Sequence, residues 1–250
     1  MIYRYFLYLS YKGTNYHGWQ VQKNVVAVQE VLNECLSTIL RKKIATFGSG
    51  RTDTGVHAIE QVVHFDWSKK LNGDDFIYKL NSLLPKDIAA NKIRLVKPEA
   101  HSRFDAIERA YIYQITTFKN PFIENQAYYF REPLDLDKMN ALSSILMECK
   151  DYESFSRVKT DVNHFLCDVY KTAWSAEGHM ITFKVTANRF LRGMVRTMVG
   201  TMLEVGLGNM SVNEFQDILA SKNRKRAGMA VPPRGLFLQS VKYPGELFIG

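Results

Sequence analysis

Cysteines are few in this chain of 250 residues, and long apolar runs and internal repeats are absent. Cys35, Cys149 and Cys167 lie far apart without the spacing of a metal site, which predicts reduced thiols and argues against a structural zinc. No apolar run approaches the roughly 18 residues needed to span a bilayer. The N-terminal residues alternate as in a strand and lack the charged start and cleavage site of a signal peptide. We therefore expect a cytoplasmic protein without a membrane segment.

Acidic residues are also fewer than basic ones, with 25 Asp and Glu against 33 Lys and Arg, and the net charge is +8. Such an excess favours polyanionic partners without identifying one. Basic residues cluster at Arg41 to Lys43 and at Lys222 to Arg226, and each cluster could contact nucleic acid or simply be a solvated surface. The 13 tyrosines and 15 phenylalanines are enough both to fill a core and to stack on bases.

Hydrophobic spacing predicts alternating strands and helices in both halves of the chain. Strands are predicted over residues 3–11, 44–47, 61–67, 93–96, 109–117, 170–175, 180–187 and 236–243. Helices are predicted over residues 28–40, 74–84, 137–147, 189–205 and 211–220. Asp74 is the expected N-cap of the second helix, and Ser211 with Glu214 forms a capping box at the start of the last one.

This order of elements favours an α+β fold in two αβ domains of similar topology, residues 1–105 and 106–250, with largely antiparallel sheets. The first domain would carry the glycine-rich loop described next. A ligand site in a cleft between two domains is the ordinary expectation for such a chain.

The segment from Gly48 to Ala58 is rich in glycine around a single carboxylate, Asp53. Glycine permits left-handed backbone and close approach of a ligand, and Arg51 can keep the carboxylate ionised and fix its direction. Most Gly–Asp loops are only turns in which the Asp bonds its own backbone. A phosphate cradle is excluded because neither of the known Gly-rich spacings is present. We expect His57 to order this loop by a hydrogen bond and His64 to be structural.

Residues 50–57, Gly-Arg-Thr-Asp-Thr-Gly-Val-His, resemble the signature Gly-Arg-Thr-Asp-x-Gly-Val-His of the tRNA pseudouridine synthase A family. Further similar elements are spread over nearly the whole chain. They include Arg109 to Tyr113, Asn188 to Arg196 and Gly235 to Leu238. The sequence departs from the family pattern at Thr54, where Ala is common, and at residues 163–167, which lack a basic residue often present there.

The resemblance implies a role for each of five residues. Asp53 matches the essential aspartate and would be the nucleophile, and Arg196 matches the arginine that pairs with it and orients it. Tyr111 matches the tyrosine that stacks on the target base, whereas Tyr113 on the same strand face is left open between site and core. Leu236 would line the base pocket, and Arg51 belongs to the same substrate-binding set.

The resemblance also implies the reaction: isomerisation of uridine to pseudouridine at tRNA positions 38, 39 and 40, by a homodimer. The reaction breaks the N1–C1′ bond, turns the base and rejoins it through C5 without redox change, so we expect no cofactor and no metal. A non-catalytic RNA-binding module is the first rival, although binding alone needs no carboxylate near phosphates. A glycoside hydrolase is the second, but such enzymes generally use two carboxylates. The sequence leaves open whether Asp53 attacks C1′ or C6 or removes a sugar proton.

Overall fold

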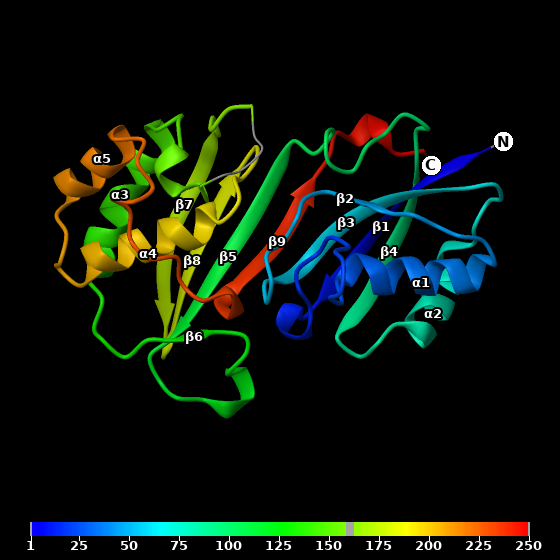
Figure 1. Cartoon of the computed structure of the whole chain (residues 1–250), viewed down its shortest axis with the longest axis horizontal. Helices are drawn as coiled ribbons and strands as arrows, with labels where there is room; N and C mark the ends of the chain where they lie inside the picture. Colours follow the sequence, from blue (N-terminus) through cyan, green and yellow to red (C-terminus); the bar gives the residue numbers. More distant parts are fainter. Residues whose placement is uncertain (1, 159–162, 250) are drawn as a thin grey trace. The chain divides into compact units, whose positions relative to one another are not determined.

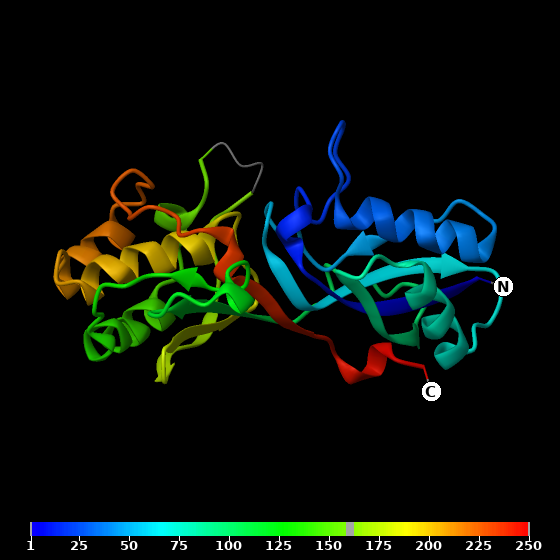
Figure 2. The ribbon, with the colours of Figure 1, turned by 90° about the horizontal axis from the view of Figure 1, so that it is seen from below.

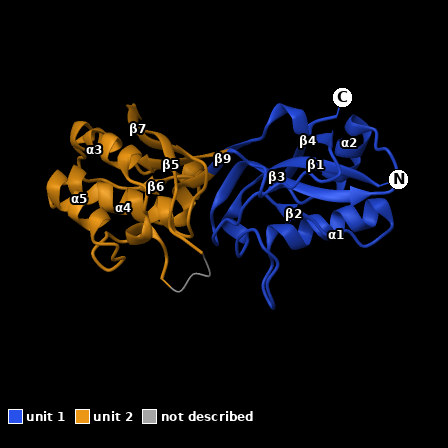
Figure 3. Ribbon diagram, turned by 90° about the horizontal axis from the view of Figure 1, so that it is seen from above, with its two compact units in different colours: residues 1–107, 238–250 blue, residues 108–237 orange. Residues whose placement is uncertain are grey.

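The computed structural model describes residues 2–158 and 163–249. They divide into two compact units, unit 1 with residues 1–107 and 238–250 and unit 2 with residues 108–237 (Figure 3). The C-terminal segment packs with the first half of the chain, since the Lys97 N–H donates to the Leu247 carbonyl and the Ile249 N–H donates to the Leu95 carbonyl. This division differs from contiguous domains 1–105 and 106–250 in the placement of that segment.

Unit 1 is built on an antiparallel sheet with the strand order β4-β1-β3 (Figure 1). Its strands are β1 (Tyr3–Tyr11), β2 (Phe47–Gly48), β3 (His57–Trp67) and β4 (Ile88–Val96), with the short β2 paired to β3. Its helices are α1 (Val28–Leu40) and α2 (Gly73–Leu83). Each helix buries one apolar stripe, that of α1 consisting of Val28, Leu32 and Leu36. The spacing of three and four residues in the sequence therefore identified the buried face correctly.

Unit 2 repeats this plan with the strand order β5-β8-β7, again antiparallel (Figure 1; Figure 2 gives the view from below). Its strands are β5 (Glu108–Thr116), β6 (Tyr128–Tyr129), β7 (Val169–Glu177) and β8 (Met180–Ala187). Its helices are α3 (Leu136–Glu148), α4 (Met194–Gly206) and α5 (Val212–Ala220). Strand β9 (Leu236–Lys242) begins in unit 2 and ends in unit 1. Helices combined with largely antiparallel strands confirm the predicted α+β class.

The predicted strand over residues 44–47 is wrong, because only Phe47 and Gly48 pair with a neighbouring strand. The backbone before them bonds to side chains of α1 instead: the Ile44 N–H donates to Ser37 Oγ at 2.9 Å and the Thr46 N–H donates to Asn33 Oδ1 at 3.1 Å. Side-chain partners thus replace the ladder that the apolar pattern suggested.

Two predicted helix starts are also wrong. The helix expected from residue 189 begins at Met194, because Gly193 before it has φ +74°, a left-handed value that interrupts the helix. The second helix begins at Gly73 after Asn72, and Asp74 lies inside its first turn instead of capping it. The capping box of Ser211 and Glu214 is confirmed in both of its hydrogen bonds.

Candidate active site

Asp53 lies on the loop between β2 and β3, as the sequence predicts, and its side chain is half-buried. The Asp53 carbonyl accepts the Val56 N–H at 3.1 Å, and Gly55 inside this turn has φ +77°. A residue with a Cβ would be strained at that φ, so the glycine of the loop has a conformational reason. Arg51 two residues earlier is exposed, and its influence on the Asp53 carboxylate stays a prediction.

The loop is held on one side by the segment that follows β1. The Trp19 N–H donates to the Thr52 carbonyl at 3.2 Å, and the Gly55 N–H donates to the Tyr16 carbonyl at 3.3 Å. The buried hydroxyls of Tyr11 and Thr52 lie 2.9 Å apart and share a hydrogen bond. Bonds therefore flank Asp53 on both sides along the chain and fix its backbone.

Two glycines let this segment approach the loop so closely. Gly18 has φ +86°, and a Cβ there would collide with the Thr52 carbonyl oxygen. A Cβ on Gly13 would collide with the Val56 carbonyl oxygen. Neither contact follows from the local sequence, because the backbone that each glycine meets lies far away along the chain.

Strand β3 holds the loop from the other side. The buried His57 accepts the Gly13 N–H on Nδ1 at 3.0 Å, which confirms His57 as the hydrogen-bonding residue that orders the loop. Gln61, fully buried, donates from Nε2 to the Gly50 carbonyl at 3.0 Å and accepts the Ser49 hydroxyl. Side chains of β3 thus tie down both the start and the end of the loop.

Asp87 supports the loop from a distance, a role that was not predicted from the sequence. Its carboxylate accepts the Tyr16 hydroxyl at 2.6 Å and the Asn15 side-chain amide at 3.0 Å, and its carbonyl accepts the Lys12 N–H at 2.9 Å. Burial and the neighbouring Asp87 carboxylate raise the pKa of Tyr16, which stays a neutral donor. Since the Tyr16 carbonyl accepts the Gly55 N–H, Asp87 is connected to the loop of Asp53 through one residue.

Tyr111 and Tyr113 share a face of β5 but differ in their surroundings. Tyr113 is fully buried and donates its hydroxyl to the Pro232 carbonyl at 2.8 Å, and burial raises its pKa. Tyr111 is half-buried and packs edge-on against Phe190, with ring centroids 5.0 Å apart at 81°. Tyr113 is thus a core residue, and Tyr111 is the ring that retains an accessible surface.

Arg196 lies in the first turn of α4 and is half-buried. Its Nε donates to the Val231 carbonyl at 2.7 Å, and the Val231 N–H donates back to the Arg196 carbonyl at 3.1 Å. The segment before Val231 can lie on α4 because Gly200 has no Cβ to collide with the Met229 carbonyl. The guanidinium is therefore oriented by backbone within unit 2, whereas its pairing with Asp53 of unit 1 stays a prediction.

Leu236 is buried at the start of β9. Gly235 before it packs on β5, where a Cβ would come within 2.6 Å of the Gln114 carbonyl oxygen and 2.8 Å of the Tyr113 ring. This close contact fixes the start of β9 beside β5, the strand of Tyr111 and Tyr113. Core packing accounts for the burial of Leu236, and its contact with a substrate base stays a prediction.

The two basic clusters, Arg41 to Lys43 and Lys222 to Arg226, differ in their surroundings. Arg41, Lys42 and Lys43 are all exposed at the end of α1. In the second cluster, Lys222 forms an ion pair with Asp151 at 2.7 Å, and Arg224 donates to the carbonyls at the end of its own loop.

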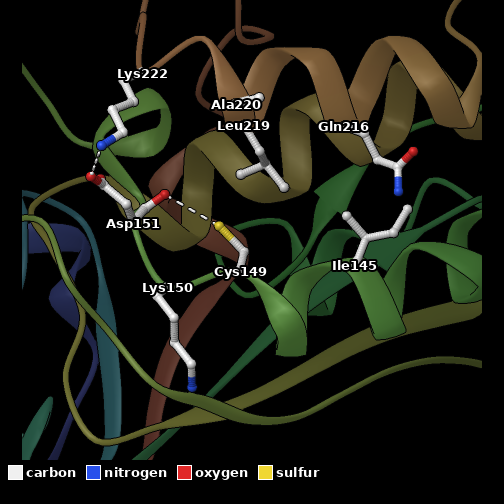
Figure 4. Close-up of a pocket in the computed structure, with 8 residues that line it drawn as sticks. All are labelled: Ile145, Cys149, Lys150, Asp151, Gln216, Leu219, Ala220 and Lys222. Atoms are coloured by element: carbon white, nitrogen blue, oxygen red, sulfur yellow. Dashed lines mark hydrogen bonds and ion pairs between the residues drawn. The ribbon is translucent and has the colours of Figure 1, made fainter.

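A shallow hollow of about 400 Å³ lies between the C-terminal ends of α3 and α5 (Figure 4). Lys222 crosses its rim toward Asp151, and the Cys149 thiol donates to the Asp151 carbonyl beside it. The lining residues are Ile145, Cys149, Lys150, Asp151, Gln216, Leu219, Ala220 and Lys222. The five predicted site residues are absent from this lining, so the hollow is separate from the chemistry considered above.

In the described residues, 2–158 and 163–249, no helix is long and apolar enough to cross a membrane. Over the same ranges, no three His, Cys, Asp or Glu side chains gather as metal ligands would.

Comparison with known proteins gives matches along almost the whole chain. A family model described as tRNA pseudouridine synthase matches residues 8–105 and 149–244. A protein of Bacteroides fragilis named tRNA pseudouridine synthase A is 47% identical over 247 residues, 98% of each chain. A protein of the same name from Parabacteroides distasonis is 45% identical and covers 98% of each chain. Another from a Thermoanaerobacter species is 37% identical over 94% of this chain and 97% of its own. A solved Cbf5-Nop10-Gar1 complex matches at 11% identity with a TM-score of 0.33, covering 79% of this chain and 54% of that one, and carries no argument.

Proposed function

We propose a substrate position and a mechanism for this chain, which belongs to the tRNA pseudouridine synthase family. It is an isomerase that converts uridine to pseudouridine in tRNA. The proposed targets are uridines 38, 39 and 40 of the anticodon stem-loop. The observation that carries the mechanism is the fixed loop of Asp53, whose backbone is bonded to the segment after β1 on both sides of the carboxylate.

Asp53 is the proposed nucleophile. Its carboxylate would act at the uridine ring or the sugar, the N1–C1′ bond would break, and the freed uracil would turn and bond to C1′ through C5. C5 loses a proton, N1 takes one up from water, and any bond formed to Asp53 breaks as the carboxylate is regenerated, so atoms and charge balance without a redox partner. Because the loop is already ordered, the carboxylate is presented without the entropic cost of arranging it.

Tyr111 is the proposed stacking surface for the detached uracil. Its half-buried ring is backed by Phe190, which supports one edge and leaves surface for a base. Leu236 adds an apolar wall and Arg51 a cation at the substrate. Arg196, oriented by Val231, would pair with the Asp53 carboxylate and keep it ionised. This proposal requires residues of both units to act on one uridine.

The partner follows from the same chemistry. A-form RNA hides its major groove, so a basic surface would read tRNA by shape and phosphates more than by base edges. Recognition by shape and phosphate contacts suits an enzyme that accepts three neighbouring uridines. The target base must leave its stack, at a cost of about a few kcal/mol. We further propose that the enzyme works in the cytoplasm as a homodimer.

Incubation with a tRNA transcript tritiated at C5 of uridine tests the activity. Isomerisation should release tritium from C5 while the mass of an unlabelled tRNA stays unchanged. A glycoside hydrolase would instead release uracil and lower the mass of the RNA, and a binding module would do neither. Transcripts with cytidine in place of uridine at two of the three positions identify the target. Tritium release that persists when all three are replaced would overturn the proposed positions.

A further inference from the structure

Four aromatic rings of unit 1 gather at the base of the catalytic loop, and we call Phe47, His64, His101 and Phe104 the ring cluster. Phe47 stacks on His64 with centroids 5.0 Å apart at 14°, and His64 meets His101 at 4.5 Å. His101 in turn meets Phe104 at 4.3 Å. The two phenylalanines at the ends are exposed by 55% and 72%, whereas His64 between them is 4% exposed. The cluster therefore has a buried centre and two open rings.

Hydrogen bonds fix this cluster to the strands that carry the catalytic loop. The Ser102 N–H donates to His64 Nδ1 at 3.2 Å, and the Ser102 hydroxyl donates to the Phe47 carbonyl at 2.6 Å. The Asp105 carboxylate accepts the His101 N–H at 2.7 Å and closes the turn that presents Phe104. The open rings are thus held in place by buried contacts.

The electrostatics of the cluster suit an uncharged stack with the Arg103 cation beside its exposed end. Burial, followed by the nearby His101 and Arg4, lowers the pKa of His64 to about 4, and burial also lowers the pKa of His101. Both imidazoles are therefore neutral near pH 7. The guanidinium of Arg103 lies over the Phe104 ring, 5.5 Å from its centroid.

We propose that Phe104 and Phe47 stack an unpaired base of the bound tRNA outside the catalytic pocket, with Arg103 at the adjoining phosphate. The inference rests on the proposed function for the identity of the RNA. Aromatic rings accept any base on their faces, and a guanidinium beside them adds attraction to the backbone. The ring cluster would therefore bind without selecting sequence, as an enzyme with several target uridines requires.

The position of the ring cluster favours RNA over other occupants. Phe47 precedes Asp53 by six residues, which limits their separation to about 20 Å even for an extended chain. An anticodon loop that places one uridine at Asp53 therefore keeps other nucleotides within reach of the open rings. The net charge of +8 also favours an anionic partner over a second copy of this basic chain.

Phe104→Leu in the full-length protein tests the inference, with tRNA affinity measured by fluorescence anisotropy. Leucine keeps an apolar side chain but removes the ring, and we expect the affinity to fall about tenfold, within the range of one base stack. Phe104→Trp should restore it. Phe122→Leu is the matched control, because Phe122 is 88% exposed on a short helical turn (Pro121–Ile123) of unit 2 and should leave the affinity unchanged.

Anticodon stem-loops with one abasic nucleotide at a time locate the base. At one position the wild type and Phe104→Leu should bind equally weakly, because without the base the Phe104 ring has nothing to stack on and its removal costs no further affinity. No such position, or unchanged affinity of Phe104→Leu, would overturn the inference. The inference would also be overturned if Phe104→Leu changed the oligomeric state in sedimentation but bound RNA as well per subunit as the wild type does. The rings would then contact a second copy of the chain. These binding results stand apart from turnover, so a failure of the proposed reaction is recognised separately by tritium release.

Discussion

The loop of Asp53 in unit 1 and the residues Tyr111 and Arg196 of unit 2 are held in place in different ways. Around Asp53, backbone N–H groups of Trp19 and Gly55 make the fixing bonds, and glycine is required wherever two backbones approach. In unit 2, Tyr111 is positioned by a side-chain contact with Phe190, and Arg196 by its own Nε on a carbonyl. The position of Asp53 rests on the backbone around it, with the side chains of His57 and Gln61 at the ends of the loop, whereas Tyr111 and Arg196 are positioned by contacts of their own side chains.

This difference predicts opposite responses to mutation. Truncating one side chain in unit 2 should remove one contribution and leave the rest of the site in place. Adding a single methyl group near Asp53 should shift the loop as a whole, because backbone contacts have no flexible side chain that could move aside. The following predictions test this contrast in order of expected effect.

Asp53→Asn should lower turnover by on the order of 10⁴-fold or more, as loss of a nucleophile does. The amide keeps the size of the side chain and leaves the backbone bonds of the loop intact, so tRNA affinity should stay within about tenfold, or roughly 1.4 kcal/mol. Single-turnover tritium release and anisotropy measure the two quantities. Appreciable turnover, after deamidation back to Asp has been excluded by mass spectrometry, would remove Asp53 from its role.

Gly18→Ala should lower turnover by about a hundredfold without touching any reacting group, because a displacement near 1 Å at the chemical centre has that effect. The added Cβ collides with the Thr52 carbonyl, and the φ of +86° strains alanine as well. Gly245→Ala is the control, since space around that residue is open. Thermal unfolding distinguishes a shifted loop from a lost fold: the folded fraction should retain tRNA affinity. Wild-type turnover in folded Gly18→Ala would contradict the backbone account of the loop.

The sequence predicted the location of Asp53 and the ordering role of His57, because both lie in one short motif. The contacts of Gly13, Gly18 and Asp87 could not be predicted, because their partners lie far away along the chain and become neighbours only through the sheet. These contacts follow from strand pairing, and no local pattern encodes them.

The errors in secondary structure have the same origin. Residues 44–46 were predicted to be part of a strand, yet Ser37 and Asn33 of α1 accept the N–H groups of Ile44 and Thr46. The helix start at Met194 was missed because Gly193 interrupts a run whose apolar spacing continues on both sides. Element types that rest on long periodic segments, such as α1 and β5, were confirmed.

Tyr111 and Tyr113 test the contrast within unit 2. Tyr111→Ala should weaken productive base binding by about 1–3 kcal/mol, roughly five- to 150-fold, whereas Tyr111→Phe should keep it. Tyr113→Phe should instead lower stability by about 1–3 kcal/mol, since the Pro232 carbonyl loses its donor in a buried place. Single-turnover kinetics and urea unfolding separate the two effects. Wild-type kinetics of Tyr111→Ala beside an inactive but folded Tyr113→Ala would show that the wrong ring was assigned to the base.

The two basic clusters give the smallest expected effect and extend the contrast to the surface. Arg41, Lys42 and Lys43 are exposed, whereas Lys222 already holds Asp151 at 2.7 Å and would have to break that pair to reach a phosphate. Changing the first three residues to Gln should therefore weaken all tRNA substrates about equally. The log–log slope of affinity against salt should fall by about 0.7–0.9 for each phosphate that the protein no longer neutralises.

Lys222→Gln removes a single unit of charge and should leave this slope unchanged, which makes it the control for a basic residue that is already paired. Titrations of anisotropy at several salt concentrations measure both variants. If Lys222→Gln lowers the slope and the triple variant does not, then the paired lysine leaves Asp151 to bind RNA and the exposed cluster is only a solvated surface. A slope near zero for the wild type would exclude phosphate contacts by either cluster, because release of counterions is what makes the binding depend on salt.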